Sequence, residues 1–196
     1  KVAVGAAIQT WEHGTPQHQK ESYYRYALEG YSGNEVMFAC VEELASSAAE
    51  PRLVAVRKTA DGGTEQLHDH DVLSLFERPN PFMSRYELIA ALIMYRAVSG
   101  NGYLEKVRSG AGRVVELWPL RPDRMWVIPD RERHIRGWEY KLGGEVYYLD
   151  ARDVIHSRTR NPLDDYYGMP PVRPAAMRID SSNAMRAFTQ SFFSNA

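Results

Sequence analysis

The densest cluster of chemistry-bearing side chains in the sequence is the run His68, Asp69, His70 and Asp71. Two histidines in an H-x-H pair on a strand share one face, and neighbouring carboxylates can complete a metal site. The run immediately precedes an expected helix, however, and Asp69 or Asp71 is a typical N-cap for such a helix. No third ligand pattern lies nearby, so we predict a helix start here and no bound metal.

His156, adjacent to Ser157, is the second candidate for chemistry. A serine nucleophile needs a histidine base and an oriented acid, and in one large class it lies in a G-x-S-x-G motif that this sequence lacks. Val154 and Ile155 precede the histidine in a strand-like pattern, which favours a structural role. A G-x-x-x-x-G-K-[ST] phosphate-binding loop is also absent from the sequence. We therefore predict no catalytic residue, no cofactor and no enzymatic activity.

Arginines flank the aromatic residue Trp126, and this pattern is typical of two kinds of surface. Interleaved cations and aromatics occur in proteins that bind single-stranded nucleic acid. Nearby carboxylates offset the charge, and pairing between subunits explains the same arginines equally well. The arginines are Arg121, Arg124, Arg131, Arg133 and Arg136, and the carboxylates are Asp123, Asp130 and Glu132.

The composition is that of an ordinary globular domain. The chain has 196 residues, 44% of them hydrophobic and 25% charged, with a formal net charge of −1. These values argue against a disordered or fibrous protein and against a strongly basic nucleic-acid clamp. No stretch approaches the roughly 18 apolar residues that span a bilayer, and the apolar N-terminus is too short for a signal peptide. We expect a soluble protein with no membrane partner.

Cys40 is the single cysteine, so the chain cannot form an internal disulfide. It lies in the apolar run 36–41, away from any basic or helix-terminal setting that would activate a thiol. We predict that Cys40 is a small buried core residue.

The first hundred residues contain the signals of several helices. Asn34 is a good N-cap for a helix ending near residue 49, and Met37, Val41, Leu44 and Ala48 are its expected buried row. A strand at 53–58, a turn at 61–63 and a short helix at 72–77 follow. The next helix begins with the capping box of Ser84 and Glu87 and ends at Gly100, which suits a left-handed cap.

Short strands separated by turn residues follow Gly100. They are expected at 103–107, 114–117, 125–129, 137–142, 145–149 and 154–157, with Trp118 and Pro119 ending the second of them. A loop at 161–171 and a helix from about 172 to 193 complete the pattern. The sequence therefore predicts an α+β fold in which helices precede a small antiparallel sheet or partial barrel and a long helix ends the chain.

Residues 1–33 are predicted to form an N-terminal arm. The segment 11–19 shows neither helical nor strand periodicity. Tyr23, Tyr24, Tyr26 and Tyr31 offer amphipathic contact area, either for packing on their own domain or for docking on a neighbouring subunit. The first three are the candidates for a subunit contact.

Six short motifs occur together in an order that resembles the portal proteins of tailed bacteriophages and prophages. The resemblance covers about residues 35–196, and it departs from the family at Pro170, where a small polar residue is usual. The motifs are A-C-V-E-E-L-A at 39–45, P-N-P-F-M-S at 79–84, G-N-G-Y-L at 100–104, E-L-W-P-L-R-P at 116–122, D-V-I-H at 153–156 and Y-G-M-P-P-V at 167–172.

This resemblance implies a subunit of a homo-oligomeric ring, usually a dodecamer, at one vertex of the virion capsid. Such a ring passes double-stranded DNA during packaging and ejection, and it docks the terminase motor and the head–tail connector; it assembles in the cytoplasm of the bacterial host. Residues 34–171 would then be a wing-like α+β domain and residues 172–196 the truncated start of a stem-like helix. Arg173, Arg178 and Arg186 are candidates to meet DNA phosphates or an adjacent subunit.

Two other functions are compatible with parts of the sequence. A stand-alone nucleic-acid-binding module would use the arginine-flanked sheet and bind in a salt-sensitive way as a monomer. A metal-dependent hydrolase would use His68, His70 and His156, and would contain stoichiometric zinc or manganese.

Overall fold

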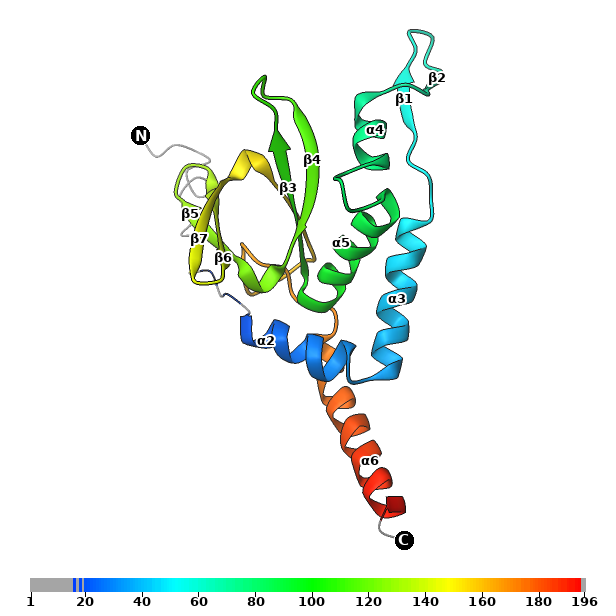
Figure 1. Cartoon of the computed structure of the whole chain (residues 1–196), viewed down its shortest axis with the longest axis vertical. Coiled ribbons are helices and arrows are strands. Elements are labelled where there is room, and N and C mark those ends of the chain that lie inside the picture. Colours follow the sequence, from blue (N-terminus) through cyan, green and yellow to red (C-terminus); the bar gives the residue numbers. More distant parts are fainter. Residues whose placement is uncertain (1–15, 17, 19, 195–196) are drawn as a thin grey trace, which may run out of the picture.

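The computed structural model describes residues 16, 18 and 20–194, and Figure 1 shows the arrangement of their elements. Most helices and a small β-hairpin lie on one side of the molecule, the remaining strands lie on the other, and a long C-terminal helix projects away from both. The α+β class, the small antiparallel sheets and the final long helix are as the sequence predicts. The expected arm segment 11–19 lies almost wholly outside the described residues.

The helical side is built from four main segments. Helix α2 (Lys20–Arg25) continues into the π-helix η1 (Tyr26–Tyr31), and α3 (Glu35–Ala49) packs against α5 (Arg85–Ser99). Residues 20–31 of the predicted arm are therefore helical. Between α3 and α5 lie the hairpin of β1 (Ala55–Lys58) and β2 (Thr64–Leu67) and the short helix α4 (Asp71–Glu77).

Local capping explains where the long helices begin and end. Asn34 accepts a hydrogen bond from the Met37 N–H at 3.0 Å, and Ser84 and Glu87 form the predicted capping box. Gly100 ends α5 at a φ of 79°, in the left-handed region that glycine adopts without a steric penalty. A Cβ there would lie 2.5 Å from the Met169 carbonyl carbon, so this close approach also requires glycine.

The strands that follow Gly100 form two antiparallel three-stranded sheets. In the first sheet β3 (Asn101–Arg108) lies between β4 (Val114–Leu120) and β8 (Val154–Arg158). In the second sheet β6 (His134–Leu142) lies between β5 (Met125–Asp130) and β7 (Glu145–Asp150). Together they curve into an open barrel (Figure 1), which agrees with the prediction of a partial barrel. The short 3₁₀ helices η2 (Pro122–Arg124) and η3 (Ala151–Asp153) connect the sheets.

The barrel encloses an aromatic core. It contains buried side chains from both sheets and from the loop after β8: Tyr103, Leu120, Met125, Trp138, Val154, Tyr166 and Tyr167. That loop leads through η4 (Arg173–Ala175) into α6 (Ala176–Ser194), the projecting helix of Figure 1.

Three local predictions are wrong, each for a physical reason. The buried row of α3 is Met37, Val41, Ala45 and Ala49, because α5 packs on that side, so Leu44 and Ala48 are exposed. Cys40 is exposed for the same reason.

The second strand of the barrel also differs from the prediction. Pro119 does not end it, because β4 is an edge strand in which a missing donor is tolerated, and Pro119 pairs with Leu104.

Candidate assembly and DNA-contact surfaces

His156 is a structural residue of the barrel, as its strand setting predicts. Its imidazole stacks on Tyr103 with ring centroids 4.4 Å apart and meets the edge of Trp138 at 5.0 Å. Nε2 lies 2.9 Å from Oδ1 of Asn101, and that oxygen also accepts the Gly168 N–H at 2.7 Å. Burial, with a smaller contribution from Arg158, lowers the pKa of His156 to about 3. The ring is therefore neutral at pH 7 and fixed in place.

His70 caps a helix. Its Nδ1 lies 3.2 Å from the Val72 N–H at the start of α4, where Asp69 or Asp71 was the expected cap. The imidazole nitrogen accepts the same hydrogen bond that a carboxylate would. Within the described part of the chain no three His, Cys, Asp or Glu residues gather closely enough to hold a metal ion, so His68, His70 and His156 do not form a ligand set there.

Trp126 on β5 is not an open platform for a nucleic-acid base. The His18 ring stacks on it, with centroids 3.5 Å apart and planes 8° from parallel, and Lys141 Nζ lies 4.2 Å from the ring centroid. Arg121 forms two parallel hydrogen bonds to Asp123, at 3.1 and 2.9 Å. Side chains of the same chain therefore already occupy this part of the arginine-flanked sheet.

Three of the four tyrosines of the predicted arm have different surroundings. Tyr23 is buried with Met37 and Val41 of α3, and burial raises the pKa of its hydroxyl. Tyr26 packs against the same cluster, whereas the Tyr24 side chain is 63% exposed. Tyr24 is thus the tyrosine of this group whose ring is available to another molecule.

The base of α6 is fixed to the N-terminal helices by polar contacts. Arg186 binds Glu35 and donates to the Gly33 carbonyl at 3.1 Å, and Asp180 binds Arg25 at 2.8 Å. Asn183 donates to the Glu29 carbonyl at 2.9 Å. These contacts all come from one face of α6, because residues 180, 183 and 186 are spaced by three.

The three arginines predicted to contact DNA or an adjacent subunit therefore differ in their surroundings. Arg186 is engaged within its own chain, whereas Arg173 and Arg178 are exposed and form no ion pair with another described residue. Two of the three cations on this segment remain available for phosphate or for a neighbouring subunit.

An exposed apolar stripe runs along the opposite face of α6. Met185, Phe188 and Phe192 are 69%, 72% and 63% exposed, and their spacing of three and four places them together on one side. Isolated exposed apolar residues are common, but a stripe of large ones on a projecting helix is typical of an interaction surface.

An apolar groove lies between α3 and the base of α6. Its volume is about 450 Å³, and Arg178 is the one charged residue among its described lining residues. Val36, Cys40 and Leu44 of α3 form one wall, in a row with a spacing of four. The groove was not predicted from the sequence, where α3 was expected to have a single buried row. The sequence signal that could have predicted the groove is the presence of apolar residues on two sides of α3.

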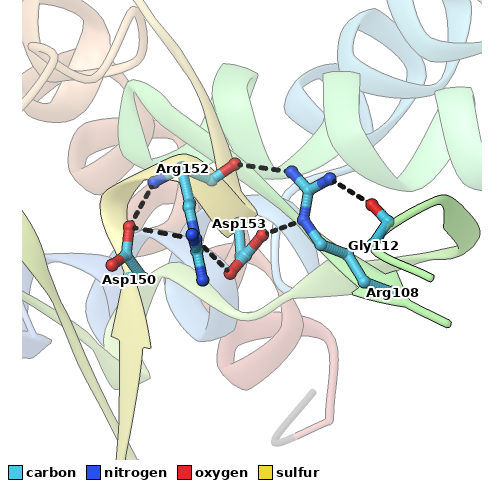
Figure 2. A network of polar contacts seen from close by, with 5 residues as sticks. All are labelled: Arg108, Gly112, Asp150, Arg152 and Asp153. Carbon is cyan, nitrogen blue, oxygen red and sulfur yellow. Dashed lines mark hydrogen bonds and ion pairs between the residues drawn. The ribbon is translucent and has the colours of Figure 1, made fainter. Parts of the chain in front are cut away.

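A polar network ties the far end of the barrel together (Figure 2). Arg108 binds Asp153, donates to the Gly112 carbonyl at 2.9 Å and reaches the Arg152 carbonyl at 3.5 Å. Asp150 accepts the Arg152 N–H at 2.9 Å and caps η3. Hydrogen bonding from Arg108 lowers the pKa of Asp153. The network joins the β3–β4 turn to the β7–β8 connection, so its evident role is structural.

The structure combines a barrel with an aromatic core, a projecting helix held at its base by polar contacts, and exposed apolar surfaces. No described helix is both long and apolar enough to cross a bilayer. The profile of the phage portal protein family matches residues 35–196. The chain belongs to this family, whose members are structural components of the particle rather than enzymes.

Individual relatives agree with this assignment. A chain in the neck of an empty gene transfer agent particle, computed with C6 symmetry, is 32% identical with a TM-score of 0.84, covering 98% of this chain and 52% of that one. A chain in the neck of the native particle, computed with C12 symmetry, is 31% identical with a TM-score of 0.77, covering 97% and 50%.

Curated sequences also match this chain, at lower identity. An uncharacterized protein of Rickettsia felis is 25% identical over 80% of this chain and 40% of its own length. A probable portal protein of Haemophilus phage HP1 is 29% identical over 58% of this chain and 33% of its own length. The chain thus spans about half or less of the relatives it matches.

Proposed function

We propose that this chain is the wing and the start of the stem of a portal subunit. In this proposal the subunits form a ring, of about twelve copies, at one vertex of a phage or gene transfer agent capsid. Double-stranded DNA passes through the ring during packaging and ejection, and the ring docks the terminase and the head–tail connector. The observation that carries the proposal is the family match over residues 35–196, supported by the likeness to neck chains from particles with cyclic symmetry.

The shape of the chain supports an assignment of α6 to the stem. The helix projects from the body in Figure 1, and its base is held by the contacts of Asp180, Asn183 and Arg186. A rigidly held projecting helix suits a passage wall, because its position does not depend on a flexible joint. In this proposal Arg173 supplies the positive charge closest to the DNA, and Arg178 faces an adjacent subunit.

The near-neutral charge of the chain suits a conduit. Affinity for DNA rises steeply with every phosphate that a protein neutralises. A passage lined with many cations would therefore hold the duplex, whereas a formal net charge of −1 is compatible with weak and exchangeable contacts. The terminase, in this proposal, supplies the energy for movement.

DNA binding by the isolated chain separates this proposal from a stand-alone nucleic-acid-binding module. We expect weak binding to duplex and to single strands, with a loss of no more than about tenfold between about 50 and about 200 mM salt. A module that binds through the arginine-flanked sheet would bind single strands tightly as a monomer. It would lose about a thousandfold or more in affinity over the same salt range. Fluorescence anisotropy with both kinds of DNA decides between the two.

A further inference from the structure

We propose that the apolar groove between α3 and α6 receives the outer face of α2–η1, carrying Tyr24 and Leu28, from the next copy of the chain in the ring. The inference rests on the proposed ring function and assigns a contact within it. It starts from the groove, which is open, apolar and about 450 Å³ in volume.

The α2–η1 segment presents an exposed pair of large side chains. Its inner side, with Tyr23 and Tyr26, packs into the chain's own core. On its outer side Tyr24 and Leu28 are 63% and 53% exposed. An aromatic and an aliphatic side chain four positions apart are a typical anchor for an apolar groove.

Cyclic symmetry requires two different surfaces that fit each other. A ring of more than two copies closes through heterologous contacts, in which one surface of each copy meets another surface of the next. The groove and the Tyr24–Leu28 face meet this requirement, because both belong to one chain and one is concave while the other projects. The C12 symmetry of a similar neck chain supports this type of contact.

The two surfaces also lie at the same level along α6. Residues Arg178 and Ser182 of α6 line the groove, and Asp180 and Asn183 hold the α2–η1 segment. The proposed assignment of α6 to the stem sets the ring axis roughly parallel to this helix, and rotation about such an axis keeps every residue at its own level. The groove of one copy and the Tyr24–Leu28 face of the next copy therefore lie at the same height in such a ring, where they can meet.

Arg178 adds a polar element to the contact. It is the charged member of the described groove lining and forms no ion pair with a described residue. A guanidinium commonly stacks on an aromatic ring, so Arg178 can cover the face of the incoming Tyr24. Because stable interfaces bury about 1,200 Å² or more in total, this groove is one contact among several between neighbours.

Cys40 provides a direct test, because it lies in the groove wall and is the chain's single cysteine. The test uses the complete gene product that carries this chain, with any cysteine outside these 196 residues replaced by serine. In Leu28→Cys, a short bis-maleimide should join Cys40 of one copy to residue 28 of the next. Every copy carries both reactive cysteines, one at position 40 and one at position 28. We therefore expect a ladder of dimers, trimers and larger products on a denaturing gel.

Two controls make the ladder specific. Leu28→Cys combined with Cys40→Ser should give no ladder, because the groove wall then has no thiol to react. Tyr148→Cys with the native Cys40 should also give none, because Tyr148 is 73% exposed on β7, away from α6.

Labelling of the unchanged protein keeps the proposal testable if a variant fails to fold. We expect Cys40 to react with a maleimide at least tenfold more slowly in the assembled ring than in dissociated subunits. A ring that forms while Cys40 stays reactive, or that gives no ladder with Leu28→Cys, overturns this contact and leaves the portal function standing. If the complete gene product forms no ring at all, the portal function fails and this contact fails with it.

Discussion

At the scale of single residues, Asn101 holds together segments that are distant in the sequence. Its Oδ1 accepts the Gly168 N–H and lies 2.9 Å from His156 Nε2, and its Nδ2 donates to the Ser99 carbonyl at 3.0 Å. The side chain is buried, so water cannot replace these bonds.

We expect Asn101→Ala to lower the free energy of unfolding by about 2–3 kcal/mol, because it leaves buried polar groups without partners. Urea denaturation measures the change. The exposed Gln190→Ala on α6 is the control, and it should change stability by less than about 0.5 kcal/mol. Equal effects of the two substitutions would contradict the structural role of Asn101.

His156 should make the chain sensitive to acid. Its pKa is lowered to about 3 by burial, below the value of about 6.5 expected in the unfolded chain. Between these two values the unfolded state binds more protons, so stability falls as the pH drops from about 6.5 towards 3.

We predict that His156→Phe, which removes the titration, loses less stability between pH 7 and pH 4.5 than the unchanged chain. Urea midpoints at the two pH values give the comparison. Carboxylates such as Asp153 contribute to acid loss in both proteins, so the difference between them isolates His156. Parallel loss in the two proteins would show that the histidine does not titrate in this way.

At the scale of elements, the network of Figure 2 should stabilise the junction of two turns. Arg108→Ala removes an ion pair with Asp153 and two hydrogen bonds to carbonyls, and we expect a loss of about 1 kcal/mol. Arg152→Ala is the matched control, because its side chain is 76% exposed and its ion pairs are worth little. Thermal unfolding measures the stability of both variants. A larger loss of stability in Arg152→Ala than in Arg108→Ala would contradict the structural role of this network.

The turn from α5 into β3 depends on Gly100. Alanine there would combine an unfavourable left-handed backbone with a close approach to the Gly168 and Met169 backbone. We expect Gly100→Ala to cost about 2 kcal/mol or more, measured by urea denaturation. Gly110→Ala is the control, because a Cβ at Gly110 meets nothing within 4 Å. A tolerated Gly100→Ala would show that this junction can move.

Elements with local signals are predictable from the sequence. The Asn34 cap, the Ser84–Glu87 capping box and the Gly100 terminus each depend on a few neighbouring residues. The burial of Cys40 and Leu44 was predicted wrongly, because it depends on where α5 and α6 pack. Helical periodicity shows that a face is apolar, but a distant segment decides whether that face is covered.

The candidate surfaces follow the same rule. The arginines at 173, 178 and 186 were named because the resemblance implies a stem-like helix there. The ion pair of Arg186 with Glu35, by contrast, joins residues 151 positions apart. The α3–α6 groove likewise joins distant segments, so no local pattern defines it. The sequence predicted that Tyr23 and Tyr24 could both be contact residues. Only the packing of α2 shows that Tyr23 is buried and Tyr24 is exposed.

At the scale of the whole molecule, the chain combines a rigid barrel with an asymmetric surface. The α3–α6 groove and the apolar stripe of Met185, Phe188 and Phe192 lie on different parts of the helical side and α6. Head-to-tail association needs different surfaces on each copy, and it closes into a ring when the rotation between copies permits it. Assembly, rather than chemistry, is therefore the property that these surfaces support.

The most direct test of this account is the mass and shape of the complete gene product. Light scattering and negative-stain imaging should show a ring of about twelve copies with a central hole. The 196-residue chain measured beside it shows how much of the assembly these residues carry alone. A complete gene product that stays a monomer or dimer at every concentration would contradict the portal function.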